Sequence, residues 1–225
     1  MKNILLTVFI ISISLSLKSK PSQCYGSTSD GSIENTLQLP VEGENFVIYH
    51  SFGNVMGRNY VHSIVHRVIL NSYAQLFKSR PNTKFKYAET GWKNGGGFKP
   101  HKTHQNGLSV DFMVPVINKE GNSDYFTTNI ENKFGYDVEF DQQGAFQNFT
   151  IDFEAIAAHI VALDKAAKKL DVGVKRVIFA PELRRKLFNT SLGEYLKNNI
   201  VFMKNKAWVR HDEHYHIDFD ISCKN

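Results

Sequence analysis

The last predicted strand constrains the fold more than any other part of the chain. Residues 214–221 read His-Tyr-His-Ile-Asp-Phe-Asp-Ile, a strict alternation of polar and apolar side chains. Since successive side chains of a strand point to opposite faces, residues 215–221 predict a strand with one face in a hydrophobic core. The polar face then carries His214, His216, Asp218 and Asp220. Such a strand requires a sheet with one covered face and one polar face.

A second segment, residues 108–114, shows the same alternation. Its apolar positions are Leu108, Val110, Phe112 and Val114. If the two strands pair with their apolar faces in the core, Asp111 comes to lie beside His214 and His216 on the other face. His104 precedes Asp111 by seven residues and lies in the loop that leads into this strand, so it can fold over the same position.

This clustering of imidazoles around one carboxylate is typical of a metal site. Two imidazoles and one carboxylate, with a fourth position open to water, are the ligand set of a catalytic Zn²⁺ ion. Such an ion lowers the pKa of bound water toward 7 and polarises a carbonyl group. Spacing alone does not choose between His214 and His216 as ligand. The competing interpretations are surface histidines or a hydrogen-bonded polar network without metal. A structural zinc is disfavoured because it prefers cysteine ligands.

The remaining periodicities place helices around an antiparallel sheet and predict a single α+β domain over residues 24–225. Helices are predicted at residues 57–78, 152–170, 182–188 and 192–199, with Asp152 as the N-cap of the second. Further strands are predicted at residues 46–50, 84–89, 125–128, 136–140 and 176–180. Loops are predicted at residues 94–103, with three consecutive glycines, and 118–124. No internal repeat is present.

The N-terminus is typical of an export signal. Lys2 precedes a mostly apolar stretch at residues 4–17, which is too short to span a bilayer, and polar residues follow. We therefore expect residues 1–23 to be a signal peptide, with a lipid anchor on Cys24 as the alternative, and no transmembrane segment after its removal. In an oxidising compartment Cys24 and Cys223 predict one disulfide, with two unpaired thiols as the alternative.

The net charge of the chain gives little support to nucleic-acid binding. The formal charge is +5, from 27 basic and 22 acidic residues, and Lys2, Lys18 and Lys20 lie in the predicted export segment. Without these three lysines the net charge is +2, and no run of basic residues remains that would neutralise a phosphate backbone. We therefore expect no nucleic-acid partner.

Two motifs resemble those of a known enzyme family. They are His101-Lys-Thr-His104-Gln-Asn-Gly107-Leu-Ser-Val-Asp111 and His211-Asp-Glu-His214-Tyr-His216. Together they resemble the penicillin-insensitive murein endopeptidases, within the wider lysostaphin, D-Ala-D-Ala peptidase and Sonic hedgehog metallopeptidase group. The resemblance extends over most of residues 24–225. It implies a periplasmic zinc peptidase that cleaves the D-alanyl–meso-diaminopimelyl cross-link, with peptidoglycan as substrate.

The resemblance also implies roles for individual residues. Carried over by motif position, His104, Asp111 and His216 would bind one Zn²⁺ per chain. His214 would be the general base or would stabilise the transition state. His211 would be its partner in positioning water or substrate, and His101 would line the site. Glu213 is the alternative base, because Glu-x-x-His places the catalytic Glu in the dipeptidases of the same group. On a regular strand, however, Glu213 would face away from His214.

Several residues near the motifs keep two interpretations. Trp92 and Trp208 could wall a substrate groove or pack at the rim of the core. Asp218 and Asp220 could support the ligand imidazoles or lie on a solvated face. Two further functions also stay open. They are a D-Ala-D-Ala carboxypeptidase or dipeptidase and a non-catalytic, zinc-stabilised cell-wall-binding module. The sequence makes no prediction of oligomeric state.

Overall fold

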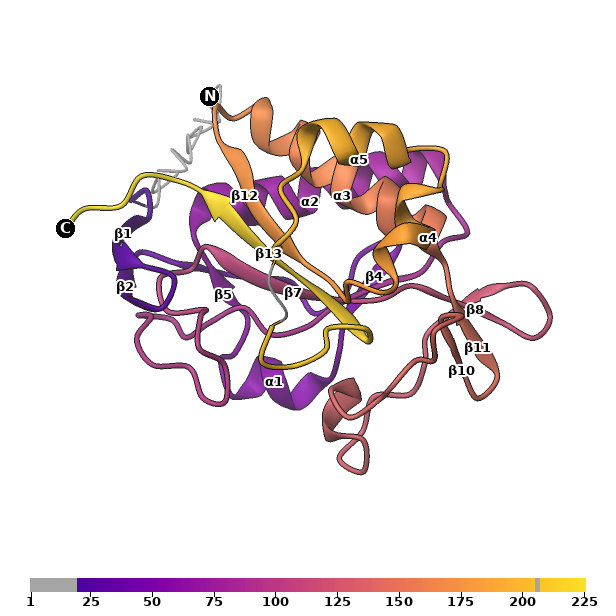
Figure 1. The fold of residues 1–225 in the computed structure, drawn as a ribbon. Coiled ribbons are helices and arrows are strands. Elements are labelled where there is room, and N and C mark those ends of the chain that lie inside the picture. The colour runs from indigo at the N-terminus through magenta and orange to yellow at the C-terminus, as the bar shows by residue number, and fades with distance from the viewer. Residues whose placement is uncertain (1–19, 205–206) are drawn as a thin grey trace, which may run out of the picture.

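A five-stranded sheet lies at the centre of the protein (Figure 1). The computed structural model describes residues 20–204 and 207–225, so the predicted signal peptide falls outside the described residues up to residue 19. The strand order is β12 (Gly173–Ile178), β13 (His214–Asp220), β7 (Ser109–Met113), β6 (Phe85–Tyr87) and β4 (Phe46–Ile48). All neighbours are antiparallel except β4 and β6, which are parallel. Two helices, Ser51–Val55 and Ser63–Ser79, lie between those two strands in the sequence, in keeping with the long connection that a parallel crossover requires.

The two strands that carry the motifs are neighbours, as the alternation predicts. In the register of β7 and β13, His216 lies opposite Asp111, and Asp218 lies opposite Ser109. Residues paired in this way project from the same face of the sheet. The apolar side chains of both strands are almost completely buried on the other face. The predicted convergence of Asp111 and His216 on one face is therefore confirmed.

Helices cover the apolar face of this sheet, which confirms the α+β class (Figure 1). They are α2 (Ser63–Ser79), α3 (Phe153–Lys168), α4 (Arg184–Phe188) and α5 (Gly193–Asn199). Helix α3 contacts the other three helices and β12, and its buried alanines allow this close approach. Asp152 caps α3 as predicted, accepting a hydrogen bond from the Ala155 amide at 2.9 Å.

The prediction that the first long helix begins at residue 57 is wrong by six residues. Tyr60–Val61 instead form the short strand β5, which pairs with β3 (Leu37–Gln38). The helix α2 begins after His62, whose side chain accepts a hydrogen bond from the Ile64 amide. This capping contact fixes the start of the helix, although the apolar periodicity runs through it.

Residues 125–128 and 136–140 are not strands, contrary to the prediction. A separate sheet instead has the order β10 (Ala145–Phe146), β11 (Phe149–Ile151), β8 (Val116–Asn118) and β9 (Ser123–Asp124). It projects from one end of the molecule (Figure 1). Between its strands lies the 3₁₀ turn η1 (Lys133–Gly135). The Phe140 amide donates to the Asp212 carboxylate and not to a neighbouring strand. The apolar alternation of residues 136–140 therefore indicates side chains that pack inward, without strand pairing.

The two ends of the described chain are joined. The hairpin of β1 (Gln23–Ser27) and β2 (Asp30–Glu34) carries Cys24, which forms a disulfide with Cys223. The hairpin also contacts the loop before β7, because the Gln105 amide donates to the Thr28 carbonyl at 3.0 Å. The short helix α1 (Ser51–Val55) lies on the side of the loop before β7 that is opposite to this hairpin (Figure 1). Within the described residues, no helix combines the length and apolarity that crossing a bilayer requires.

Candidate metal centre

The carboxylate of Asp111 lies at the centre of the histidine cluster and is completely buried. On its Oδ1 side, the Nε2 atom of His104 lies 3.3 Å away. The Nδ1–H of His104 donates to the Thr90 carbonyl at 3.1 Å, so the neutral ring turns its Nε2 lone pair toward the carboxylate. This buried Nε2 has no hydrogen-bond partner among the described residues. Two electron-rich atoms face each other there when the ring is neutral, and a cation between them would stabilise this arrangement.

His216 occupies the same side of the carboxylate. Its Nδ1 lies 2.8 Å from Asp111 Oδ1, and its Nε2 lies 2.9 Å from Asp218 Oδ1. Asp218 is 1% exposed and also accepts from the Arg176 Nε at 2.6 Å. Burial opposes protonation of His216, but Asp218 and Asp111 outweigh it and raise its pKa to about 10. A carboxylate behind a ring that faces a metal is the usual support of a metal-binding imidazole.

Three groups face the other oxygen of the carboxylate, Oδ2. The Tyr136 hydroxyl donates to it at 3.0 Å, and the His101 Nδ1 and His214 Nε2 atoms lie 3.6 Å and 3.8 Å away. Burial raises the pKa of Tyr136 well above its usual value, so this hydroxyl keeps its proton. The carboxylate therefore divides the centre into an Oδ1 half with His104 and His216 and an Oδ2 half with these three groups.

The residues before β13 extend the Oδ2 half. The His211 ring lies 4.6 Å from that of His214, and its Nδ1–H donates to the Val209 carbonyl at 2.9 Å. Burial lowers the pKa of His214 to about 4 and that of His211 to about 3, so both rings are neutral near pH 7. Neutral imidazoles can accept a proton during a reaction.

Glu213 does not face away from His214, contrary to the prediction. Its Oε1 lies 2.7 Å from His214 Nδ1. The strand β13 begins only at His214, so strand alternation does not govern the preceding residue. Burial raises the pKa of Glu213 to about 8. This carboxyl therefore contacts the ring edge that points away from Asp111, and it orients His214.

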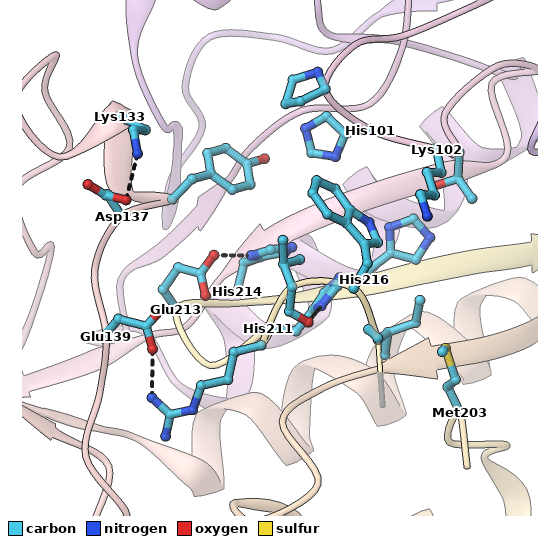
Figure 2. A pocket seen from close by; sticks show the side chains of 18 of the residues that line it. His101, Lys102, Lys133, Asp137, Glu139, Met203, His211, Glu213, His214 and His216 are labelled. Atoms are coloured by element: carbon cyan, nitrogen blue, oxygen red, sulfur yellow. Dashed lines mark hydrogen bonds and ion pairs between the residues drawn. The ribbon is translucent and has the colours of Figure 1, made fainter. Parts of the chain in front are cut away.

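A cleft of about 810 Å³ opens onto these rings (Figure 2). His101, His211, His214 and His216 converge in it, with Lys102 toward one end and the Lys133–Asp137 pair toward the other. Other lining residues include Tyr136, Glu139, Arg176, Met203, Trp208, Arg210 and Glu213. The cleft thus gives a bound molecule access to the Oδ2 half of the centre.

The two tryptophans occupy different positions. Trp208 is 56% exposed and lines the cleft, with the Lys102 ammonium 5.8 Å from its ring centroid. Trp92 is not among the residues that line the cleft. Its ring instead packs against Phe98 and lies 4.8 Å from the Arg58 guanidinium carbon. The structure therefore favours the groove interpretation for Trp208 and the packing interpretation for Trp92.

The donor atoms of His101, His104 and Asp111 lie within 4.8 Å of one another, a spacing that suits one metal ion. The set expected from sequence, His104, Asp111 and His216, shares two of these three residues. Sequence reasoning missed Tyr136 and also Glu89, which accepts a hydrogen bond from His101 Nε2 at 2.6 Å. Both residues lie at an end of a predicted strand, 84–89 or 136–140, but no motif marks them as site residues, because only the fold brings them to the centre.

Comparison with known proteins identifies one family. The family model described as penicillin-insensitive murein endopeptidase matches residues 24–225. That range includes the whole histidine cluster, the cleft and both cysteines. Among curated proteins, no significant match to this chain is found.

Proposed function

Because this chain belongs to the family of penicillin-insensitive murein endopeptidases, we propose that it is a zinc-dependent peptidase that hydrolyses the D-alanyl–meso-diaminopimelyl cross-link of peptidoglycan. The observation that supports a bound metal ion is the buried Nε2 atom of His104, which has no hydrogen-bond partner among the described residues and points at the Asp111 carboxylate. Imidazole and carboxylate are donors that Zn²⁺ accepts readily. A cation between these atoms removes the repulsion of their lone pairs.

His104, Asp111 and His216 would hold one Zn²⁺ per chain. When bound, the ion acts as a Lewis acid that activates water and polarises the scissile carbonyl. Asp218 keeps the His216 ring in place through its Nε2. The Tyr136 hydroxyl donates a hydrogen bond to Asp111 Oδ2. This contact orients the carboxylate so that its Oδ1 faces the ligand histidines.

The remaining histidines of the cleft would move protons. His214 is neutral near pH 7 and presents its Nε2 on the Oδ2 side of Asp111. With its Nδ1–H donating to Glu213 Oε1, the Nε2 atom carries the lone pair and can take a proton from the attacking water. Glu213 contacts the opposite nitrogen and keeps the ring oriented. His211 presents its Nε2 beside that ring, because its Nδ1–H is held by the Val209 carbonyl. It would position water or the scissile amide.

The cleft offers a peptide both basic and acidic side chains. Lys133, Arg176 and Arg210 line it and pair with Asp137, Asp218 and Glu139. Lys102 also lines it and can meet a carboxylate of a bound peptide. The volume of the cleft lies within the usual range for ligand sites, about 300–1,000 Å³. Among the described residues that line it there is neither serine nor cysteine, so these side chains offer a β-lactam no serine or cysteine nucleophile. A peptidase that acts on murein works outside the cytoplasm, in keeping with an export signal at residues 1–23 and the Cys24–Cys223 disulfide.

Digestion of purified peptidoglycan sacculi tests this function. Incubation with the zinc-loaded protein is expected to convert cross-linked muropeptide dimers into monomers, as measured by mass spectrometry. A zinc chelator should abolish the conversion, and penicillin should leave it unchanged. Shortened pentapeptides with intact dimers would instead identify a carboxypeptidase. An unchanged profile from protein that holds zinc would identify a binding module.

The assignment of the base predicts a separation between zinc binding and turnover. Replacing His214 with Ala should leave most of the zinc bound, because it does not contact the Oδ1 half, and should lower kcat by about 10²–10⁴-fold. The Glu213→Gln variant retains a hydrogen-bonding group beside the His214 ring, so its kcat should fall much less than that of His214→Ala. His66→Ala, on the distant helix α2, is the control. An active His214→Ala together with an inactive Glu213→Gln would make Glu213 the base.

A further inference from the structure

Glu89 is a buried carboxylate on which several donors converge, next to the metal centre. It is 6% exposed. The Arg58 guanidinium pairs with both of its oxygens, Nε with Oε1 and Nη2 with Oε2 at 2.9 Å. The Tyr49 hydroxyl donates to Oε1 at 2.8 Å, and His101 Nε2 lies 2.6 Å from Oε2. None of these contacts was expected from the sequence, and neither the family match nor the proposed mechanism uses Glu89.

The surroundings of Arg58 fix this carboxylate firmly. The guanidinium carbon lies 4.1 Å from the ring centroid of Phe98 and 4.8 Å from that of Trp92. A stacked, bidentate guanidinium has little freedom to turn, and it favours the ionised form of its partner. Glu89 therefore presents an ionised Oε2 to His101, and an ionised carboxylate can only accept a hydrogen bond.

This arrangement determines which nitrogen of His101 carries the proton. The Nε2–H must donate to Glu89, so a neutral ring carries its lone pair on Nδ1. That nitrogen lies 3.6 Å from Asp111 Oδ2, and His101 lines the cleft. The backbone N–H of Glu89 also lies 3.4 Å from the Tyr136 hydroxyl, which in turn donates to the same Oδ2.

We propose that Glu89 is a positioning residue that holds His101 as the Nε2–H tautomer and so presents the Nδ1 lone pair to the metal centre. The donor atoms of His101, His104 and Asp111 already have a spacing that suits one ion. Glu89 thus supports the Oδ2 half of the centre as Asp218 supports the Oδ1 half. This inference deepens the proposed zinc peptidase function, but the tautomer can be measured without zinc.

The Glu89→Gln variant gives a specific expectation. Arg58 Nε and the Tyr49 hydroxyl both donate to the position of Oε1, so the single amide oxygen of Gln is expected there, and Arg58 Nη2 then loses its acceptor at the position of Oε2. The amide NH₂ then takes the position of Oε2 and donates to His101 Nε2. This nitrogen must become the acceptor, which moves the ring proton to Nδ1 and removes the lone pair from the metal centre.

Long-range ¹H–¹⁵N spectra of the ¹⁵N-histidine-labelled, zinc-free protein measure this tautomer directly. They would be recorded near pH ~8.5, above the usual imidazole pKa, and His101→Gln assigns the signals. We expect Nε2–H in the wild type and a change to Nδ1–H in Glu89→Gln. The matched control, Tyr49→Phe, removes another hydrogen bond to the same carboxylate and should keep Nε2–H. Because the Nδ1 lone pair of His101 would be a further donor beside the proposed ligands His104, Asp111 and His216, competition with a chelator should show zinc Kd raised by about 10–100-fold in Glu89→Gln, the usual cost of losing such a support.

The outcomes separate this inference from the proposed function. Nδ1–H in the wild-type protein would overturn the proposal, and that measurement needs no variant to fold. An unchanged tautomer and an unchanged zinc Kd in Glu89→Gln would also overturn it. A wild-type protein with the expected tautomer that binds no zinc would refute the zinc assignment and leave the positioning of His101 standing.

Discussion

Replacing Asp111 with Asn is expected to abolish zinc binding and cross-link hydrolysis together. Among the described residues, the Asp111 carboxylate is the one anionic group that faces both His104 and His216, and the substitution removes its charge without changing its shape. An amide at this buried position also turns an N–H toward nitrogen lone pairs that a cation needs. The loss should exceed the roughly 100-fold that removal of an outer supporting residue costs. Zinc content after dialysis and muropeptide release measure it.

Asp164→Asn is the matched control for this substitution. Asp164 is 2% exposed on α3 and accepts from the Lys168 ammonium and the Tyr195 hydroxyl, far along the chain from the histidine motifs. The Asp164→Asn variant should keep full zinc content and activity, even if the substitution lowers the free energy of unfolding. If Asp111→Asn hydrolysed cross-links with zinc still bound, the centre of the reaction would lie elsewhere in the cleft.

The sequence predicts the strands that carry the chemistry because both obey one local rule. Alternation over residues 215–221 specifies which side chains share a face, and register follows once the apolar faces are buried. The same rule fails at residues 136–140, where the apolar side chains Val138 and Phe140 are buried without strand pairing. Alternation thus reports burial, and pairing depends on whether a neighbouring backbone is available.

The candidate site divides in the same way. His104, Asp111 and His216 are visible in the sequence because short spacings within a loop and two strands bring them together. Tyr136 reaches Asp111 from a turn in which Lys133 and Phe134 both have positive φ values, a conformation that no side-chain pattern announces. Glu89 reaches His101 only because β6 lies next to β7. Such contacts depend on tertiary structure, and a single sequence does not encode them as a pattern.

The second large effect that we expect is a loss of stability when the disulfide is removed. Cys24 and Cys223 are 199 residues apart, so the bond closes a loop that includes nearly all of the described chain. In the chain-entropy model, a loop of this length lowers the entropy of the unfolded state by an amount worth about 5 kcal/mol. The Cys24→Ser/Cys223→Ser double variant is therefore expected to lose up to roughly that free energy of unfolding. Its Tm should fall by about 10–20 °C.

The same bond also holds the loop that carries His104, so the double variant should bind zinc more weakly than the wild type even where both are folded. Next to the disulfide, the Lys224 amide donates to the Cys24 carbonyl at 2.9 Å, and the hairpin β1–β2 then contacts the loop through Thr28 and Gln105. Urea unfolding and chelator competition, each with and without reductant, measure the two effects. Reductant should bring the wild type to the values of the double variant and leave the variant unchanged. Equal stability of the oxidised wild type and the double variant would show that hydrogen bonds alone hold the ends together.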